Sequence, residues 1–403
     1  MYSLIIKLAY KNAFLRLSRT LLVIIMIAVS MGMMLSIQGL YDGMTLSMIE
    51  KTKRSDSGEI SVYAKGYRLS KSILDNIKDS KAIEERLKSD KRVNAVALRL
   101  KADGLCATAR KSSFATAIGV DLNAEEKFGK FSEFLKSGEL KLGKHGALVG
   151  SELAKKMKLK IGSKVIFSAQ DSHGEINAMA LKVQGVIQTN NITLDASTVF
   201  VDVKTLRNFL GVSENEITQI AIRTDSLTLQ ETLQKEYAAL EVKSFLELYP
   251  MMQQMQDVMI IFNSITFFIV MIVVFIGIMG VMYVSILDRI REFGVMKSVG
   301  MSYSLIRAQI ILEALFVGLI GYAIGATFGF LALYYLKIYG LDMSAFADGL
   351  ESFGYSSVMY ATIKTSYFSS TFLAIMSSSI LSVALPLRKI KTMNSIEATK
   401  VNI

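Results

Sequence analysis

Residues 138–145 have the spacing of a phosphate-binding loop, in which glycine-rich backbone and a lysine hold nucleotide phosphates. Gly138 and Gly143 occupy the two glycine positions, and Lys144 follows the second. His145, however, stands where a serine or threonine would ligate Mg²⁺. Because that ligand is missing, we expect this segment to bind no ATP.

Metal-ligating and nucleophilic residues are scarce in this sequence. His173, the only other histidine, has no ligand-type residue three or four positions away. Cys106 is the single cysteine, which excludes an intramolecular disulfide and any cysteine-based zinc site. No serine-hydrolase or zinc-protease motif occurs. We therefore predict no catalytic, cofactor-binding or metal site.

The most chemically varied segment, residues 287–301, separates two long apolar runs. Arg289 and Glu292 are three residues apart and can pair on a helix, which leaves Arg291 for a lipid phosphate or a partner's acid. A charged segment between membrane spans is where a cytosolic motor could act. The alternative is an ordinary basic loop.

Glycines and apolar residues complete that segment. Gly294 and Gly300 bracket a short run and permit sharp changes of direction. On a helix, Phe293, Met296 and Val299 would form an apolar face able to seat in a partner's groove. The sequence thus predicts a short amphipathic helix here.

Four apolar runs must position this segment. They cover about residues 21–40, 259–286, 310–336 and 367–387, and each reaches the ~20 residues needed to cross a bilayer as a helix. Of the 403 residues 51% are hydrophobic and 20% are charged, as expected for a membrane protein. A cleaved signal peptide ending near residue 30 is the alternative for the first run, but that run continues to Leu40, which favours a retained anchor.

Basic residues are distributed unevenly around these runs. Residues 1–20 hold four basic residues and no acid, residues 284–308 have a net charge of +2, and residues 337–366 have a net charge of −1. The bias of basic loops toward the cytosol places both termini and the 284–308 loop inside. The net charge of +11 therefore indicates orientation and anionic lipid contact, and no nucleic acid.

More than two hundred residues between the first two runs alternate strand and helix patterns, which predicts an α+β domain. Among them, strands at 93–100 and 104–109 are separated by an Asp103-Gly104 turn signal. The fold class is therefore an α-helical membrane protein with four transmembrane helices and a large α+β domain inserted between the first and second. The expected parts are an interfacial helix at 1–20, spans at 21–41, 259–286, 309–337 and 367–387, the domain at 42–258, the charged loop at 287–308, an outer loop at 338–366 and a tail at 388–403.

Methionines flank the inserted domain at helical spacing. Met44 and Met48 follow the first span, while Met251 and Met255 precede the second. Flexible thioether side chains suit surfaces that accept varied apolar shapes, so these four are candidate substrate contacts. Filler in the core or against lipid is the alternative.

Two features of the third span point to packing. Glycines at 321, 325 and 329 form a small-residue ladder that allows close helix approach in lipid. Glu313 lies one turn into the span, where an ionisable residue could hydrogen-bond across helices or snorkel to the interface. We favour a structural role for this residue.

Longer motifs resemble those of the FtsX/MacB/LolE-type ABC transporter permeases. The matching residues are RIREFGVMKSVG at 289–300, ILEAL at 311–315, GALVGSELA at 146–154 and LKIGSKV at 159–165. A tail motif at 394–398 is similar to the family's D-P-x-E-A ending, with Asn394-Ser395 in place of Asp-Pro. The segments GLYDGM at 39–44 and SFLEL at 244–248 look most like the lipoprotein-releasing LolC/LolE group.

The resemblance implies a multi-pass inner-membrane permease that dimerises with a second copy or a paralogue. It implies that the domain is periplasmic, that a separate cytosolic ABC ATPase binds ATP and Mg²⁺, and that residues 287–308 contain the coupling helix. The ATPase-coupling residues would be Arg289, Arg291, Glu292, Phe293, Gly294, Met296, Lys297 and Gly300.

Three functions fit this resemblance. The first is release of lipoproteins from the inner membrane, with membrane lipid and a possible periplasmic carrier as further partners. The second is efflux of periplasmic peptides or small molecules with an adaptor, as in the MacB group, although no nucleotide-binding domain is seen in this sequence. The third is mechanical signalling to a cell-wall hydrolase.

Overall fold

The computed structural model describes residues 2–13, 17–226, 228–352 and 354–392, which form two compact units. One, here called the membrane unit, comprises Met1–Met44, Gln256–Met343 and Val358–Ile403. The other, the globular unit, comprises Thr45–Met255 and Ser344–Ser357. The tail motif at 394–398 lies outside the described residues.

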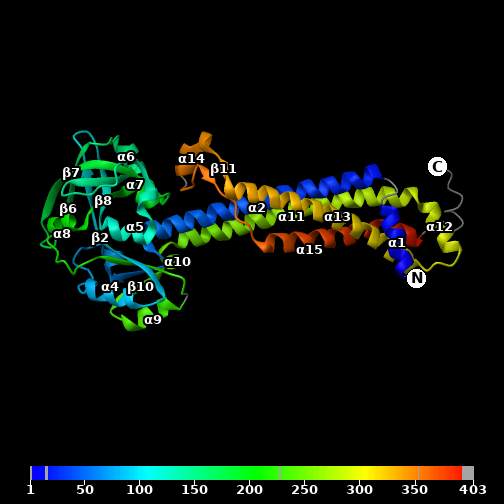
Figure 1. Cartoon of the computed structure of the whole chain (residues 1–403), viewed down its shortest axis with the longest axis horizontal. Coiled ribbons are helices and arrows are strands. Elements are labelled where there is room, and N and C mark those ends of the chain that lie inside the picture. The colour runs from blue at the N-terminus through cyan, green and yellow to red at the C-terminus, as the bar shows by residue number, and fades with distance from the viewer. Residues whose placement is uncertain (1, 14–16, 227, 353, 393–403) are drawn as a thin grey trace. The chain divides into compact units, whose positions relative to one another are not determined.

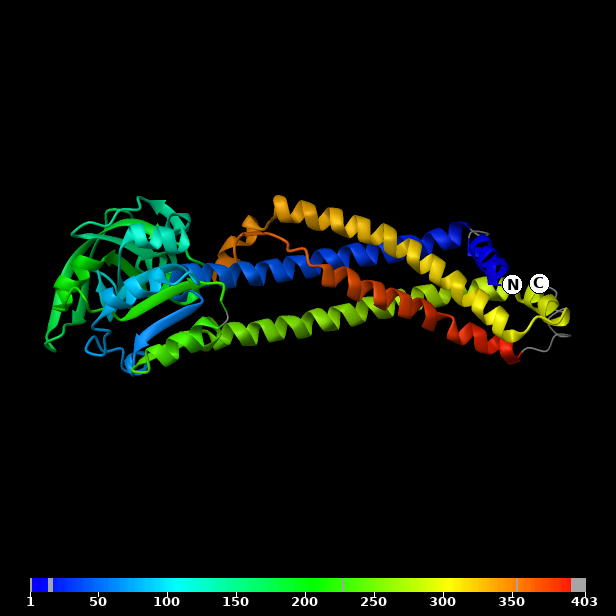
Figure 2. The same cartoon turned by 60° about the horizontal axis from the view of Figure 1, so that its bottom comes forward.

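Long helices build the membrane unit, and α2, α11, α13 and α15 are long and apolar enough to cross a bilayer. Both views show α13 running alongside α2 (Figures 1 and 2), and α15 packs against α13. A short hairpin of Leu341–Asp342 (β11) and Val358–Met359 (β12) joins α13 to α15. The helix bounds are α1 Tyr2–Ala13, α2 Leu17–Thr52, α11 Pro250–Asp288, α12 Ile290–Ser298, α13 Tyr303–Ile338, α15 Thr365–Ser382 and α16 Ala384–Thr392.

The helices do not end where the apolar runs end. The first extends past the expected residue 41 to Thr52, and the second begins at Pro250 rather than at 259. Apolar length reports the hydrocarbon thickness, whereas a helix continues for as long as its backbone hydrogen bonds can form. Pro250 fits the first helical turn because proline lacks only an N–H that would be unpaired there.

The glycine ladder of α13 packs against α2. A Cβ on Gly325 would lie 3.0 Å from both Ala28 Cα and Met31 Cβ, and one on Gly321 would lie 2.9 Å from Ile27 Cβ. These contacts leave no room for larger side chains, so the ladder allows the two helices to pack closely, as the sequence predicted.

A mixed sheet forms the globular unit. Its ten described strands follow the order β10-β1-β9-β2-β3-β8-β5-β7-β4, with β6 paired to β2 and β7. The pairs β3–β8 and β5–β7 are parallel, and the other pairs are antiparallel. The strand bounds are β1 Ile60–Ala64, β2 Val93–Ala107, β3 Ser112–Val120, β4 Leu135–Gly138, β5 Gly146–Gly150, β6 Lys164–Gln170, β7 Ile176–Ile187, β8 Thr198–Asp202, β9 Gln219–Thr224 and β10 Leu240–Ser244.

Short helices cover the sheet and confirm the α+β class. Val62, Leu100, Phe167 and Leu206 belong to its main apolar core, in which each is nearly inaccessible to solvent. The helix bounds are α3 Tyr67–Ser70, α4 Ser80–Ser89, α5 Leu122–Gly129, α6 Ser151–Met157, α7 Ile192–Ser197, α8 Val203–Leu210, α9 Leu229–Glu236, α10 Phe245–Leu248 and α14 Ala347–Ser352, with single turns η1 Lys53–Ser57, η2 Phe131–Phe134 and η3 Ser344–Phe346.

The Asp103-Gly104 turn signal was wrong, because β2 runs through it without interruption. Gly104 pairs with Ala169 of β6, and a Cβ there would lie 2.3 Å from the Ser168 carbonyl oxygen. The glycine therefore permits a close approach of two strands, which is the other common use of glycine inside a strand.

Residues 338–366, which were predicted to form an outer loop, contribute to both units. Residues 344–357 belong to the globular unit. Asn190 donates from Nδ2 to the Tyr355 carbonyl oxygen at 3.0 Å, and Tyr355 donates its hydroxyl to Met255 Sδ at 3.8 Å. These pairings are distant in sequence, so no local pattern predicted them.

Candidate functional site

Arg289 lies at the junction of α11 and α12 and holds α12 to the third span. Its Nη1 donates to both carboxylate oxygens of Glu313 at 3.1 Å, and its Nε donates to Glu292 at 3.0 Å. The Arg289 side chain is 9% exposed and that of Glu313 is 5% exposed. The pairing of Arg289 with Glu292 was predicted, but the buried pairing with Glu313 was not.

This buried cluster is incompletely satisfied. Arg289 Nη2 and both amide atoms of Gln309, one turn before Glu313, have no hydrogen-bond partner among the described residues. Buried polar groups without partners are costly. The cluster therefore combines an ion pair that engages both carboxylate oxygens of Glu313 with three polar atoms that lack a hydrogen-bond partner among the described residues.

The neighbouring residue extends the junction to the first span. Asp288, at the end of α11, forms an ion pair with Arg19 near the start of α2. Residues 288 and 289 thus connect the start of α12 to both α2 and α13. A displacement of α12 would act on three membrane-crossing helices at once.

Phe293, Met296 and Val299 do not form the single partner-facing surface that the sequence predicted. Phe293 is 1% exposed within the core of the membrane unit, and Met296 packs against the same core. Val299 and Val295, by contrast, are 83% and 50% exposed. The Arg289–Glu313 pair orients the helix so that Phe293 faces its own chain.

The exposed residues of α12 are Arg291, Glu292, Val295 and Ser298, and the exposed Val299 follows directly after the helix; these five are called the α12 face below. Gly300 follows it with a φ of 93°, so the chain reverses there as expected. Gly294 instead lies within α12 and is buried, so it makes no bend. Lys297 is partly buried on the same helix.

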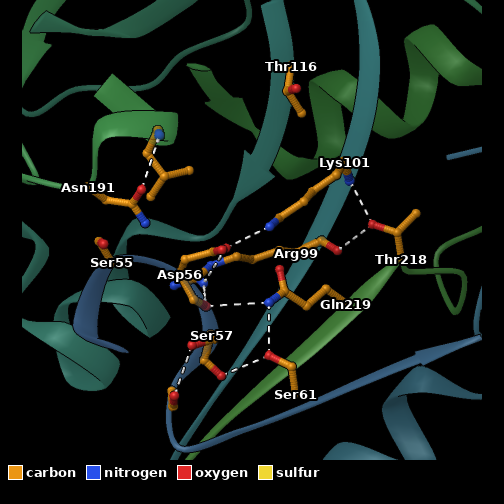
Figure 3. A network of polar contacts seen from close by, with 12 residues as sticks. Ser55, Asp56, Ser57, Ser61, Arg99, Lys101, Thr116, Asn191, Thr218 and Gln219 are labelled. Atoms are coloured by element: carbon orange, nitrogen blue, oxygen red, sulfur yellow. Dashed lines mark hydrogen bonds and ion pairs between the residues drawn. The ribbon is translucent and has the colours of Figure 1, made fainter. Parts of the chain in front are cut away.

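A second polar cluster, centred on Asp56, lies in the globular unit (Figure 3). Lys101 Nζ lies 2.6 Å from Asp56 Oδ1, and Arg99 Nη1 lies 3.6 Å from the same oxygen. Tyr249 donates its hydroxyl to the other carboxylate oxygen. Because Asp56 follows α2 and Tyr249 directly precedes α11, one carboxylate joins the ends of two long helices.

Arg99 anchors this cluster to the sheet. It is 1% exposed and makes a bidentate ion pair with Glu125 of α5, at 2.6 and 2.7 Å. Burial lowers the pKa of the Lys101 ammonium below its usual value, although Asp56 acts in the opposite direction. A buried ion pair with this geometry keeps Arg99 and Glu125 in one arrangement, because separating them would leave a buried charge without its partner.

The sequence itself contains a signal for this cluster. Arg99 and Lys101 alternate with Leu98 and Leu100 in an otherwise apolar strand. Alternation directs both cations to one face of the sheet, where buried charges require acids. The acids lie 45 residues before Lys101 and 26 after Arg99, so their identity depended on the fold.

The four candidate methionines have different environments. Met48 is buried, Met44 and Met255 are partly buried, and Met251 is 80% exposed. Among them, Met251 alone presents most of its side chain to the surroundings.

The described residues show no candidate metal site, and residues 138–145 do not have the fold of a nucleotide-binding loop. They contain no cluster of three or more metal-ligating side chains. Residues 139–145 join strand β4 to strand β5, whereas a phosphate-binding loop joins a strand to a helix.

Comparisons with known proteins agree with the fold. Residues 20–240 match the MacB-like periplasmic core domain, and residues 264–395 match the FtsX-like permease C-terminal family. The lipoprotein-releasing system transmembrane protein LolC of Buchnera aphidicola is 26% identical over 53% of this chain and 54% of its own length. The corresponding protein LolE of Haemophilus influenzae is 22% identical over 67% of this chain and 66% of its own length.

A third relative belongs to another group. The macrolide export ATP-binding/permease protein MacB of Pasteurella multocida is 27% identical over 51% of this chain and 33% of its own length. The chain therefore spans between a third and two thirds of the length of these relatives.

Proposed function

The chain belongs to the MacB/FtsX/LolCE-type family of ABC transporter permeases, and from this premise we propose that it couples ATP hydrolysis by a separate cytosolic ATPase to movement of its globular unit. The main observation in support of this proposal is the junction at Arg289. It ties a short helix with an exposed face to three membrane-crossing helices. Mechanical coupling requires such a connection.

We place α12 on the cytosolic side and the globular unit in the periplasm. Basic residues concentrate at 1–20 and 284–308, while residues 337–366 are net acidic. This distribution follows the positive-inside bias. ATP and Mg²⁺ would be held by the partner, and a second copy or a paralogue would complete the permease dimer.

The coupling proposal is tested on the α12 face. Arg291→Glu combined with Val299→Asp should leave insertion and folding intact, because both side chains are exposed. The variant should lose co-purification of the ATPase and its stimulation. Lys65→Glu, an exposed charge reversal in the globular unit, is the matched control. Normal stimulation by the double variant would refute the role of the α12 face.

For the transported substrate, we propose lipoproteins released from the inner membrane. The similarity to two lipoprotein-releasing transmembrane proteins supports this choice. So do the exposed Met251 and the half-buried Met255 at the start of α11, which could contact acyl chains.

Efflux with an adaptor is the second candidate, favoured by the match to the MacB-like core domain and by the MacB relative. The two are separated by reconstituting the permease with its ATPase in vesicles that contain a triacylated lipoprotein. ATP-dependent release to a soluble carrier supports the first candidate. Absence of release, together with adaptor-dependent ATPase stimulation, supports the second.

A further inference from the structure

A polar pocket of about 260 Å³ opens on the globular unit, and none of the four candidate methionines lines it. Its walls come from four segments that are far apart in sequence. They are the end of α2 with η1, the η2–β4 turn, the β7–α7 loop and the residues before β12. The lining side chains are Lys51, Arg54, Glu133, Phe134, Leu135, Lys136, Gln188, Asn190, Ser356 and Ser357.

The pocket has an excess of positive charge. Lys51, Arg54 and Lys136 line it together with a single carboxylate, Glu133. That carboxylate is already engaged by Arg54, whose Nη2 lies 2.6 Å from its Oε2. The lining therefore contains three basic side chains and one carboxylate.

Lys51 is the centre of this excess. Its Nζ donates to two neutral acceptors, Asn190 Oδ1 at 3.1 Å and Ser356 Oγ at 2.5 Å. Among the described residues no carboxylate lies within ion-pair distance of Lys51, although the side chain is partly buried. Asp195 and Glu133 act on it only from beyond ion-pair distance. A partly buried ammonium without a direct ion-pair partner is costly, and an anion beside it would offset that cost.

Arg54 and Ser357 provide further hydrogen-bond donors among the lining residues. Arg54 uses Nε on the Gly129 carbonyl oxygen and Nη2 on Glu133, while its Nη1 has no acceptor among the described residues. Ser357 adds a hydroxyl to the lining. The volume is several times the ~30 Å³ that one water occupies in the liquid, so an oxyanion and its nearest waters fit.

We propose that this pocket binds a phosphate group, with Lys51 as its principal charge partner and Arg54 and Lys136 as its flanking cations. Inorganic phosphate and a phospholipid headgroup share this chemistry. The site is independent of the coupling proposal, because none of its residues belongs to the α12 face.

The experiment measures the thermal unfolding of the purified full-length chain in a non-ionic detergent. Inorganic phosphate is titrated against chloride at matched ionic strength. A soluble short-chain phosphatidylglycerol is titrated in parallel against the corresponding diacylglycerol, which lacks phosphate. We expect a saturable stabilisation by at least one phosphate probe, and the probe that acts identifies the source of the group.

Variants assign the effect to the pocket. Lys51→Gln should weaken the apparent affinity about tenfold or more, because it removes a charge-assisted hydrogen bond. Lys51→Arg should restore most of the affinity. Lys136→Gln, at an exposed position that tolerates change, should also weaken binding, whereas Lys65→Gln on the same unit should not.

Either of two results would overturn the proposal. One is the absence of a saturable shift with both phosphate probes. The other is an equal response in the wild type, Lys51→Gln and Lys136→Gln. If Lys51→Gln does not fold, the comparison of Lys136→Gln with Lys65→Gln decides whether the pocket binds the probe.

Discussion

Arg289 is the residue that connects α12 to α13 at the junction of α11 and α12. Its guanidinium is nearly inaccessible to solvent and contacts a carboxylate from α13 and another from α12. In a low-dielectric region such a pair holds position strongly, because any displacement exposes an unpaired charge. The same residue has one unsatisfied nitrogen, so a second arrangement could recover a hydrogen bond that this one lacks.

Glu313→Gln should destabilise the membrane unit by roughly 3–5 kcal/mol, because it leaves Arg289 buried without its main partner. Glu292→Gln, at a side chain that is 54% exposed, should cost under about 1 kcal/mol. Unfolding of the detergent-solubilised chain measures both. Combining Glu313→Gln with Arg289→Met should cost less than the sum of the single changes. Equal effects of the two glutamate variants would contradict this assignment.

Asp195 provides a residue-scale test of pH dependence in the globular unit. Burial raises the pKa of its carboxyl to about 6, against the opposing effect of hydrogen bonds from Thr189 and Asn190. The folded state then favours the protonated form. The resulting stabilisation is complete below the unfolded pKa of about 4 and is lost as the pH rises toward 6.

Asp195→Asn removes this titration. As the pH rises from 4 to 7, the wild type should therefore lose stability relative to the variant, by on the order of 3 kcal/mol of unfolding free energy. Thermal unfolding at matched pH steps measures it. A constant difference over this range would show that Asp195 titrates normally.

At the scale of elements, α2 and α13 pack closely in the membrane unit. Glycines on α13 face Ile27, Ala28 and Met31 of α2 at distances that exclude a Cβ. Close packing drives helix association in lipid, where hydrophobicity does not discriminate. In the globular unit, the Asp56 cluster joins a different pair of elements, since it holds η1 and the residue before α11 to one carboxylate.

Gly325→Ile should overpack the α2–α13 contact and destabilise the chain by about 1–3 kcal/mol. Gly280→Ile is the matched control, because a Cβ at that position of α11 meets nothing within 4 Å. The apparent melting temperatures of both variants in the same detergent provide the measurement. If the two substitutions are equally tolerated, the close contact is absent in the membrane.

At the scale of the whole molecule, one chain contains a membrane unit that exposes the α12 face and a globular unit with its own core. The α12 face offers charged and apolar side chains to a partner, while Met251 and the phosphate pocket belong to the globular unit. The proposed roles in coupling, substrate contact and phosphate binding therefore fall on different residues, so a separate set of variants tests each of them.

Substrate contact is tested with the four methionines. Serine at Met44, Met48, Met251 and Met255 should abolish lipoprotein release from spheroplasts while the complex still assembles. Leucine at the same positions should preserve release, because it keeps an apolar surface of similar volume. Met48 is buried, so Met251→Ser combined with Met255→Ser is the safer variant and should reduce release. Unchanged release in the serine variants would remove these residues from the site.

Much of the fold followed from local patterns. Runs of about 20 apolar residues predicted the four spans, since crossing hydrocarbon demands that length. Alternating strand and helix patterns likewise predicted the α+β class of the inserted domain. Strand β10 was not predicted, because Glu241 and Lys243 interrupt its apolar pattern. The turn predicted at Asp103-Gly104 was wrong because a glycine that allows a neighbouring strand to approach cannot be distinguished in the sequence from a glycine in a turn.

The sequence alone established the four membrane spans, the inserted α+β domain, the charge asymmetry and the motif at 289–300, because each depends on neighbouring residues or on composition. The partner of Arg289, the inward turn of Phe293, the acids that neutralise Arg99 and Lys101, and the unpaired charge of Lys51 required the tertiary structure. These features arise when side chains from distant segments are buried together. Desolvation then determines which charges must pair, and no local pattern encodes that outcome.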